Sequence, residues 1–415
     1  MVTNIISAIG NNNSIYPLLV RDCGIEVPSK VYLTYKQNEK ESKEIAKLAS
    51  RERFLDEYAV SAVWLGGIPL MDKLSDKFIK SRGYNPDVNL KLFKEEKEQG
   101  IDLNLKKFQG KVPEKILEDL KKVKSNKGIY EKLLATKFIA STSVPIMFMG
   151  FVLPKLIFAS SAKKITEQKK KDAENKKIAN DTFFKTETDK FKQKINFTGN
   201  IMSNLANFST VDKMIVTDGG YAGGRVITAR NKNERYDVGF KMAGMMFLNF
   251  VAPKYIEKGF NKITDTNLGP KMLADKGFLD EVKEQKLNLP KSNEAKDLID
   301  FVDDNPDSYF VKYAQKFNKI KMLDKKTRDP RAYVDIKNLA KFNDDIINFA
   351  KKSISSGDFK KYTQKAKFIK SASIISNVAI SSALLAYALP KAQFAFRKII
   401  TGSDLEPGLA QNDKN

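Results

Sequence analysis

The chain contains no histidine and a single cysteine, Cys23, among its 415 residues. Without histidine, Ser-His-Asp and Cys-His nucleophiles are excluded, as are histidine-ligated metal sites and a histidine pH switch. One cysteine forms neither an intrachain disulfide nor a structural metal site, and we expect Cys23 to be packed as a small apolar residue. No other catalytic motif is found, so the sequence favours a protein that is not an enzyme and predicts no cofactor and no metal.

Arginine is also scarce, because only ten of the 73 basic residues are arginine and the rest are lysine. The net charge is +23 and the isoelectric point is near 9.6. Lysine is a point charge that suits anionic lipid headgroups or unspecific polyanion contact better than the reading of base edges. We therefore expect anionic membrane lipids as partners. A protein partner or a second copy of the chain is left open, nucleic acid is less favoured, and a solvated lysine-rich surface would explain the same composition.

Four apolar stretches each end in a proline that a basic segment follows: 59–69, 138–154, 242–253 and 371–390. A helix needs about 20 mostly apolar residues to span a bilayer. Residues 371–390 meet this length, and 138–154 meets it if the helix extends to Ala162 with Lys155 at the interface. The two shorter stretches suit core or interfacial helices. The pattern favours a recurring unit of apolar helix, proline and basic continuation, although the uneven spacing argues against a strict repeat.

The predicted fold is mostly α-helical and membrane-associated, with two transmembrane or deeply inserted helices, two shorter apolar helices and soluble amphipathic segments. The N-terminus lacks a basic region and a long apolar run, so we expect no secretory signal. Seven regions follow from the composition: an N-terminal helical region 1–83 with a GGIP hinge, polar connecting helices 84–135, an apolar then basic helix 136–195, a Gly-rich loop or hairpin with a short apolar helix 196–270, soluble amphipathic helices 271–365, an apolar helix 366–402 and a disordered tail 403–415.

Two local predictions concern the N-terminal region. Apolar residues recur at helical spacing from Glu41 onward and predict a helix: Ile45, Leu48, Phe54, Leu55, Tyr58 and Ala62. That helix should break at Gly66-Gly67, and Pro69 can start the next one. Trp64 lies beside this hinge and suits an interfacial anchor or core packing equally well.

A glycine cluster is the candidate binding loop of the chain. β-Branched residues flank it, which predicts a short hairpin or an ordered loop. Its spacing resembles a Walker A loop, but Arg225 stands where the phosphate-binding lysine is required and Val226 where Ser or Thr binds magnesium. A turn built on glycine is the simplest interpretation. An anion or lipid headgroup seated by backbone N–H groups is the alternative, with these residues: Gly219, Gly220, Gly223, Gly224 and Arg225.

Two charged clusters have simpler explanations than a binding site. The acidic cluster comprises Asp300, Asp303, Asp304 and Asp307. It lacks the glycine and the distal glutamate of a calcium-binding EF-hand loop, so we predict that it caps a helix near Pro306. The lysine tract at 169–171 has little aromatic interleaving for stacking on bases. We interpret it as a solvated or lipid-facing surface.

The sequence therefore favours a membrane-associated structural or interaction protein without enzymatic activity. Basic segments behind the prolines would lie at headgroup level. Two alternatives stay open. One is a small transporter or pore built from the four proline-kinked helices, and the other is a soluble basic helical protein that binds nucleic acid or another polyanion.

Overall fold

The computed structural model describes residues 19–94, 98–174, 205–206, 210–252, 255, 258–259 and 266–410. This described part is mostly helical and contains no β-strand, only one antiparallel bridge between Met322 and Arg328. It forms two compact units that are each assembled from separate stretches of chain. Unit 1 includes Asp72–Lys137 and Phe247–Leu385; unit 2 includes Cys23–Met71, Phe138–Met246 and Ala386–Asn415. The predicted mostly α-helical fold is confirmed.

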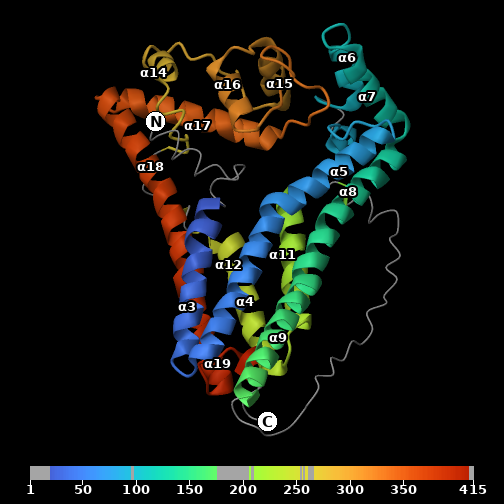
Figure 1. Ribbon diagram of the computed structural model, residues 1–415. Helices are drawn as coiled ribbons and strands as arrows, with labels where there is room; N and C mark the ends of the chain where they lie inside the picture. The colour runs from blue at the N-terminus through green and yellow to red at the C-terminus, as the bar shows by residue number, and fades with distance from the viewer. Residues whose placement is uncertain are drawn as a thin grey trace. The chain divides into compact units, whose positions relative to one another are not determined.

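Unit 1 contains short amphipathic helices around an aromatic core. They are η3 (Leu90–Phe93), α6 (Ile101–Lys107), α7 (Glu114–Ser125), α14 (Lys276–Lys283), α15 (Ala295–Asp304), α16 (Tyr309–Lys316) and α17 (Ile336–Ser355) (Figure 1). The rings of Phe310 and Phe342 lie 5.5 Å apart in this core. Asp275 caps α14 and Asp335 caps α17 by accepting backbone N–H bonds, as short polar side chains do at helix starts.

The predicted capping role of the acidic cluster is wrong. Asp300 and Asp303 lie in the second half of α15, and it is Ser308 that caps α16. Lys107 bridges the two carboxylates at 2.8 and 2.9 Å. Asp303 also pairs with the buried Arg328 at 2.8 Å. The carboxylates therefore neutralise cations that come from distant parts of the chain, which spacing along one helix does not reveal.

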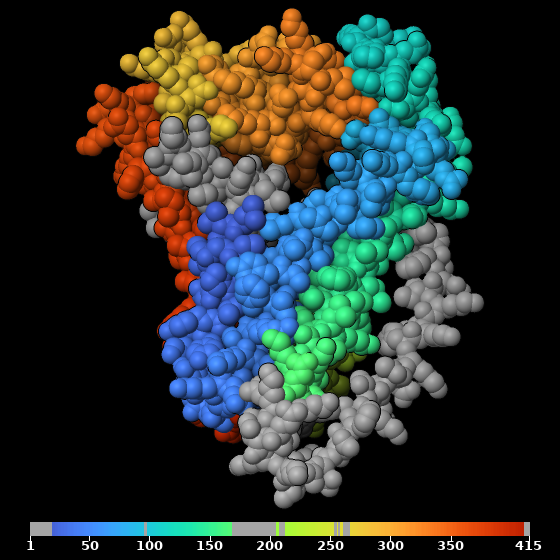
Figure 2. Space-filling view, in the orientation of Figure 1, coloured from blue at the N-terminus to red at the C-terminus, as the bar shows by residue number. Residues whose placement is uncertain are grey.

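Unit 2 is a bundle of longer helices. Those that start in it are α3 (Val27–Glu39), α4 (Lys43–Ala62), α9 (Leu153–Glu174), α11 (Thr210–Ile227), α12 (Lys232–Phe250), α19 (Leu389–Thr401) and α20 (Pro407–Ala410); η1 (Leu19–Glu26) precedes them. Two further helices, α5 (Ile68–Ser81) and α8 (Lys127–Met147), run across the division between the units, as does the end of α12. The helix α18 (Phe359–Ala383) lies in unit 1, and the chain that continues it after Leu385 belongs to unit 2. Within unit 2, α4 packs against α3 and α9 (Figure 1), and their side chains meet on the face shown in Figure 2.

Three of the four apolar stretches contain the same backbone feature. A five-residue π-helical turn directly precedes an Ile-Pro or Leu-Pro pair: η2 (Val63–Gly67), η4 (Phe148–Val152) and η5 (Leu384–Ala388). Proline lacks an N–H group and its ring crowds the carbonyl four residues earlier. The π turn widens the helix, so that Ile68 and Leu153 donate to carbonyls five residues back. The predicted break at Gly66-Gly67 is wrong, and the fourth proline, Pro253, lies outside the described residues.

Among the residues that the structure describes, two continuous helices are long and apolar enough to cross a membrane: Lys127–Glu167 with 41 residues and Phe359–Thr401 with 43 residues. They contain the predicted spans 138–154 and 371–390, which confirms both as candidates. In their most apolar windows only 39% and 22% of the residues are buried. The core helix of a soluble protein would be mostly buried, so most of each apolar surface faces outward.

The glycine cluster is helical, and the predicted hairpin or loop is wrong. Residues 210–227 form one continuous helix, α11, which packs against η4. A Cβ atom on Gly224 would lie 2.7 Å from the Cα atom of Gly150 and 3.0 Å from its carbonyl carbon. Such contacts require glycine on both sides, as at close helix crossings in membrane proteins. Close backbone approach therefore explains Gly224, and no turn is needed.

We predict that Gly224→Ala lowers the free energy of unfolding by about 1–3 kcal/mol, because the new methyl group meets backbone that cannot move away. The matched control is Gly223→Ala on the same helix, where an added Cβ meets nothing within 4 Å. It should be neutral or stabilise by up to about 1 kcal/mol through helix propensity. Thermal unfolding of the purified variants checks this, and equal shifts for both would contradict the close crossing.

Candidate functional site: a buried ionic network

The buried face of α4 is largely polar. Glu52 and Asp56 are buried together with Ile45 and Ala49, whereas Phe54 is 48% exposed. The helical spacing of the apolar residues predicts this helix correctly but does not show which of its residues are buried. Charged side chains are almost never buried without partners, so the two carboxylates indicate a polar interior of unit 2.

Glu57 is the centre of the first group of ion pairs. Arg53 lies at 2.9 Å, Lys241 of α12 at 3.1 Å and Lys30 of α3 at 3.4 Å. Burial alone would raise the pKa of Glu57, but the three cations together hold that pKa well below its ordinary value. Lys30 is shared with Glu26 at 3.1 Å. One carboxylate thus connects α3, α4 and α12.

Asp56 pairs with Arg225. Of the site residues predicted from the sequence, Arg225 is the one that takes part in the network. The guanidinium of Arg225 donates to Asp56 at 3.1 Å, and Lys241 lies 3.9 Å from the same oxygen. Burial, together with repulsion from Arg53 and Arg225, lowers the pKa of Lys241 to about 8, although Glu57 and Asp56 oppose the shift. At this end of the network the cations Arg53, Arg225 and Lys241 therefore outnumber the carboxylates Asp56 and Glu57.

Arg230 joins two carboxylates in the second group. It donates two 3.0 Å hydrogen bonds to Glu52 and pairs with Glu234 at 2.7 Å. Its guanidinium lies 4.1 Å from the ring centroid of Phe158. Burial raises the pKa of Glu52 in spite of Arg230. Here carboxylates outnumber cations.

Arg397 of α19 joins the third group. It donates to both oxygens of Asp237 at 3.2 and 3.0 Å, and Gln393 donates to Asp237 at 2.7 Å. Arg397 also pairs with Glu406 at 2.7 Å. The side chains of Arg397 and Asp237 are 1% and 0% exposed. This is the most deeply buried part of the network.

Glu406 belongs to residues 403–410, which we call the C-terminal latch. The sequence predicts a disordered tail from 403 onward, and this is wrong for the latch. Its Leu409 is buried against Ile45 and Ala49 of α4, and its Glu406 N–H donates to Asn38 Oδ1 at 2.6 Å. A short polar segment after Gly402 gives no sign of these contacts, because they are made with residues more than 350 positions away.

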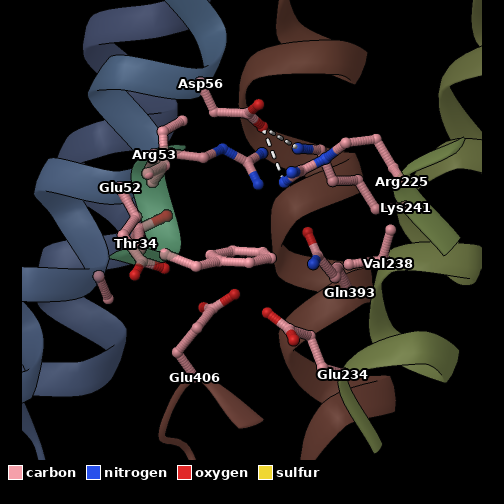
Figure 3. A pocket seen from close by; sticks show the side chains of 13 residues that line it. Thr34, Glu52, Arg53, Asp56, Arg225, Glu234, Val238, Lys241, Gln393 and Glu406 are labelled. Carbon is pink, nitrogen blue, oxygen red and sulfur yellow. Dashed lines mark hydrogen bonds and ion pairs between the residues drawn. The ribbon is translucent and has the colours of Figure 1, made fainter. Parts of the chain in front are cut away.

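The three groups surround a small cavity of about 40 Å³. Arg53, Arg225 and Lys241 gather beside Asp56 at one end, and Glu234 and Glu406 face each other at the other end (Figure 3). Buried donors on Arg225 and Arg397 and the acceptor Gln393 Oε1 have no hydrogen-bond partner within the described chain. Water both donates and accepts, and such a cavity holds on the order of one to three water molecules. It is too small for an organic substrate.

The predicted anion seat is not formed as expected. The four glycines and Arg225 lie within α11, where backbone N–H groups serve the helix, and no nest of free N–H groups results. Within the described ranges, no group of acidic or cysteine side chains could hold a metal ion. Trp64 is partly buried against Met149, Tyr221 and their neighbours. Sequence reasoning missed the network, although the charged residues just before two of the apolar stretches, Asp56 and Glu57 in one and Asp237 and Lys241 in the other, were a signal of it.

We predict that Asp56→Ala lowers the free energy of unfolding by about 3–5 kcal/mol, because it leaves the buried Arg225 uncompensated. The matched control is Glu39→Ala, which removes an exposed pair with Lys36 at 2.8 Å and should have a much smaller effect, because exposed ion pairs contribute little to stability. Denaturant unfolding of both variants measures the difference. A loss for Asp56→Ala no larger than that of the control would contradict a stabilising network.

Comparisons with known proteins give no family for this arrangement. No family model, no curated protein and no solved structure matches the chain. The function therefore has to be argued from the geometry of the two units and from the surface of the long helices.

Proposed function

We propose that the protein is an integral membrane protein that acts as a structural or interaction scaffold and is not an enzyme. The observation that carries the proposal is the outward-facing apolar surface of the two long helices. The buried network supports it, because ion pairs between helices hold a bundle together where the surroundings are as apolar as the helix surfaces.

The helix formed by α8, η4 and α9 exposes large apolar side chains over more than three turns. Five of them are between 38% and 59% exposed: Val144, Met147, Phe148, Val152 and Leu156. Lys137 and Lys155 flank the apolar stretch. Leaving such a surface in water costs about 25 cal/mol per Å², and contiguous patches of this kind mark contact with a membrane or a partner.

The second long helix, formed by α18, η5 and α19, has the same character. Phe368 is 74% exposed, and Ile375, Ile380 and Tyr387 are at least 40% exposed. No acidic residue occurs between 359 and 401. Tyrosine and phenylalanine near the ends of an apolar stretch suit the interfacial zone of a bilayer. Both long helices therefore support insertion.

A scaffold is favoured over a transporter by the interior of unit 2. The cavity has room for water only, and the ion pairs around it fix the helices against one another. A transporter needs a substrate site near the middle of its helices. No second observation supports a transporter.

We predict that the protein stays in the pellet when membranes are extracted with carbonate, and that Val144→Lys/Met147→Lys reduces this retention strongly. Each lysine costs about 2.5–3.5 kcal/mol at the centre of a spanning helix. In a soluble protein the same exposed positions would tolerate lysine within about 0.5 kcal/mol.

The matched control is Thr166→Lys, an exposed position on the same helix beyond Lys163 and Lys164. It should leave retention unchanged. Recovery of the unmodified protein in the soluble fraction without detergent would overturn the proposal. So would unchanged retention of the double variant.

We also propose anionic lipids as the membrane partner of α18. Its first turns carry five lysines without an acidic residue between them: Lys360, Lys361, Lys365, Lys367 and Lys370. The exposed Phe368 lies among them. Basic residues beside a spanning helix attract anionic headgroups, at about 1 kcal/mol per residue near the surface.

We predict that anionic lipid raises the melting temperature of the protein in nanodiscs relative to zwitterionic lipid, and that high salt reduces the gain. Replacement of Lys360, Lys361, Lys365 and Lys367 by Gln should abolish most of the gain. The control carries four Lys→Gln changes at Lys283, Lys286, Lys291 and Lys296, which lie outside both long helices. An equal gain for both variants would refute the assignment to α18.

A further inference from the structure

The C-terminal latch brings one extra negative charge into the network. Lys30 is neutralised by Glu26, and the remaining side chains joined by ion pairs are five basic and six acidic. They are Arg53, Arg225, Arg230, Lys241, Arg397, Glu52, Asp56, Glu57, Glu234, Asp237 and Glu406. Without Glu406 the two signs are equal in number. Docking of the latch therefore buries an unbalanced carboxylate.

A buried unbalanced charge is costly, and a carboxylate in such a place takes up a proton instead. We propose that the latch is proton-dependent: it docks with one proton bound among the carboxylates at Arg230 and Arg397, and it is released when that proton is lost. The proposal goes beyond the scaffold function and does not depend on insertion into a membrane.

The surroundings of Glu406 show where the proton belongs. On α19, Arg397 pairs with Glu406 and also with Asp237 of α12. Glu52 of α4 adds a negative charge, while Arg53, Arg230 and Lys241 add positive charge. Glu234 faces Glu406 across the cavity (Figure 3), and Asn38 of α3 accepts from its backbone. The guanidiniums of Arg230 and Arg397 thus pair with four carboxylates. We assign the proton to Asp237 and Glu52.

The pKa shifts have the sign that the charge count requires. Burial raises the pKa of Asp237 and of Glu52, and the charge of Glu406 adds to both shifts. Burial would raise the pKa of Glu406 itself, but four nearby cations lower that pKa below its ordinary value. Docking is therefore favoured below the raised pKa values and lost as pH rises through them.

Other contacts hold the C-terminal latch in place and do not depend on the charge of Glu406. Glu41 accepts hydrogen bonds from Ser403 and from the Asp404 N–H, and Gln37 donates to Asp404 at 2.6 Å. Asn231 donates to the Pro407 carbonyl at 2.8 Å. These residues form no part of the ion-pair groups. They allow the strength of the latch to be changed separately from its proton dependence.

The test follows the accessibility of Leu409, which is buried only while the latch is docked. Leu409→Cys is placed in a Cys23→Ser background, and its rate of reaction with a maleimide is measured from about pH 5.5 to about pH 8.5. Ile399→Cys, at a position that is 83% exposed, gives the rate of a free thiol at each pH. We expect the corrected Leu409→Cys rate to rise about tenfold or more across this range, as the loss of one proton allows.

Two variants separate proton dependence from simple weakening. Glu406→Gln keeps a hydrogen-bonding side chain but balances the charges, so its corrected rate should be nearly independent of pH. Glu41→Gln should raise the rate at every pH and keep the slope. A flat corrected rate in the unmodified latch would overturn the proposal, as would the same slope in Glu406→Gln.

Discussion

The structure of unit 2 depends on the compensation of charges inside a bundle of apolar helices. Carboxylates of α4 reach cations of α3, α11 and α12, and α19 is joined to α12 through Arg397 and Asp237. In such surroundings an unpaired charge costs several kcal/mol, so each helix is held in the one register that pairs its charges. The network therefore specifies how the helices fit together, and the apolar residues outside it are free to face lipid.

Two backbone features, π turns before prolines and a close contact between glycines, allow the helices to pack in this way. The π turns before Pro69, Pro154 and Pro390 let three long helices continue through a residue that normally ends or kinks a helix. Gly150 and Gly224 let η4 and α11 approach until their backbones touch. Both features lie beside the helices whose side chains form the ion pairs, α4, α11 and α12. The recurring proline unit of the sequence thus has a structural counterpart in three of its four copies.

Unit 2 has its charges inside and many of its large apolar side chains outside, which is the reverse of an ordinary soluble domain. Unit 1 shows the usual arrangement, with rings of phenylalanine and tyrosine in the core and capped helices around it. This contrast is the main physical support for the proposal that the two long helices lie in a membrane. A polar interior closed by the C-terminal latch also gives the protein a place where proton binding changes structure.

The sequence by itself determined the helical class, the two candidate spans and the absence of histidine chemistry, because composition and apolar length need no partner to be read. Tertiary structure decided the rest. The glycine cluster was predicted as a loop since spacing does not show that Gly150 lies against Gly224. The buried charges of α4 were not predicted, because Glu52 and Asp56 are stable inside only when Arg230 and Arg225 reach them from far along the chain. Pairing between distant residues is what a single sequence does not contain.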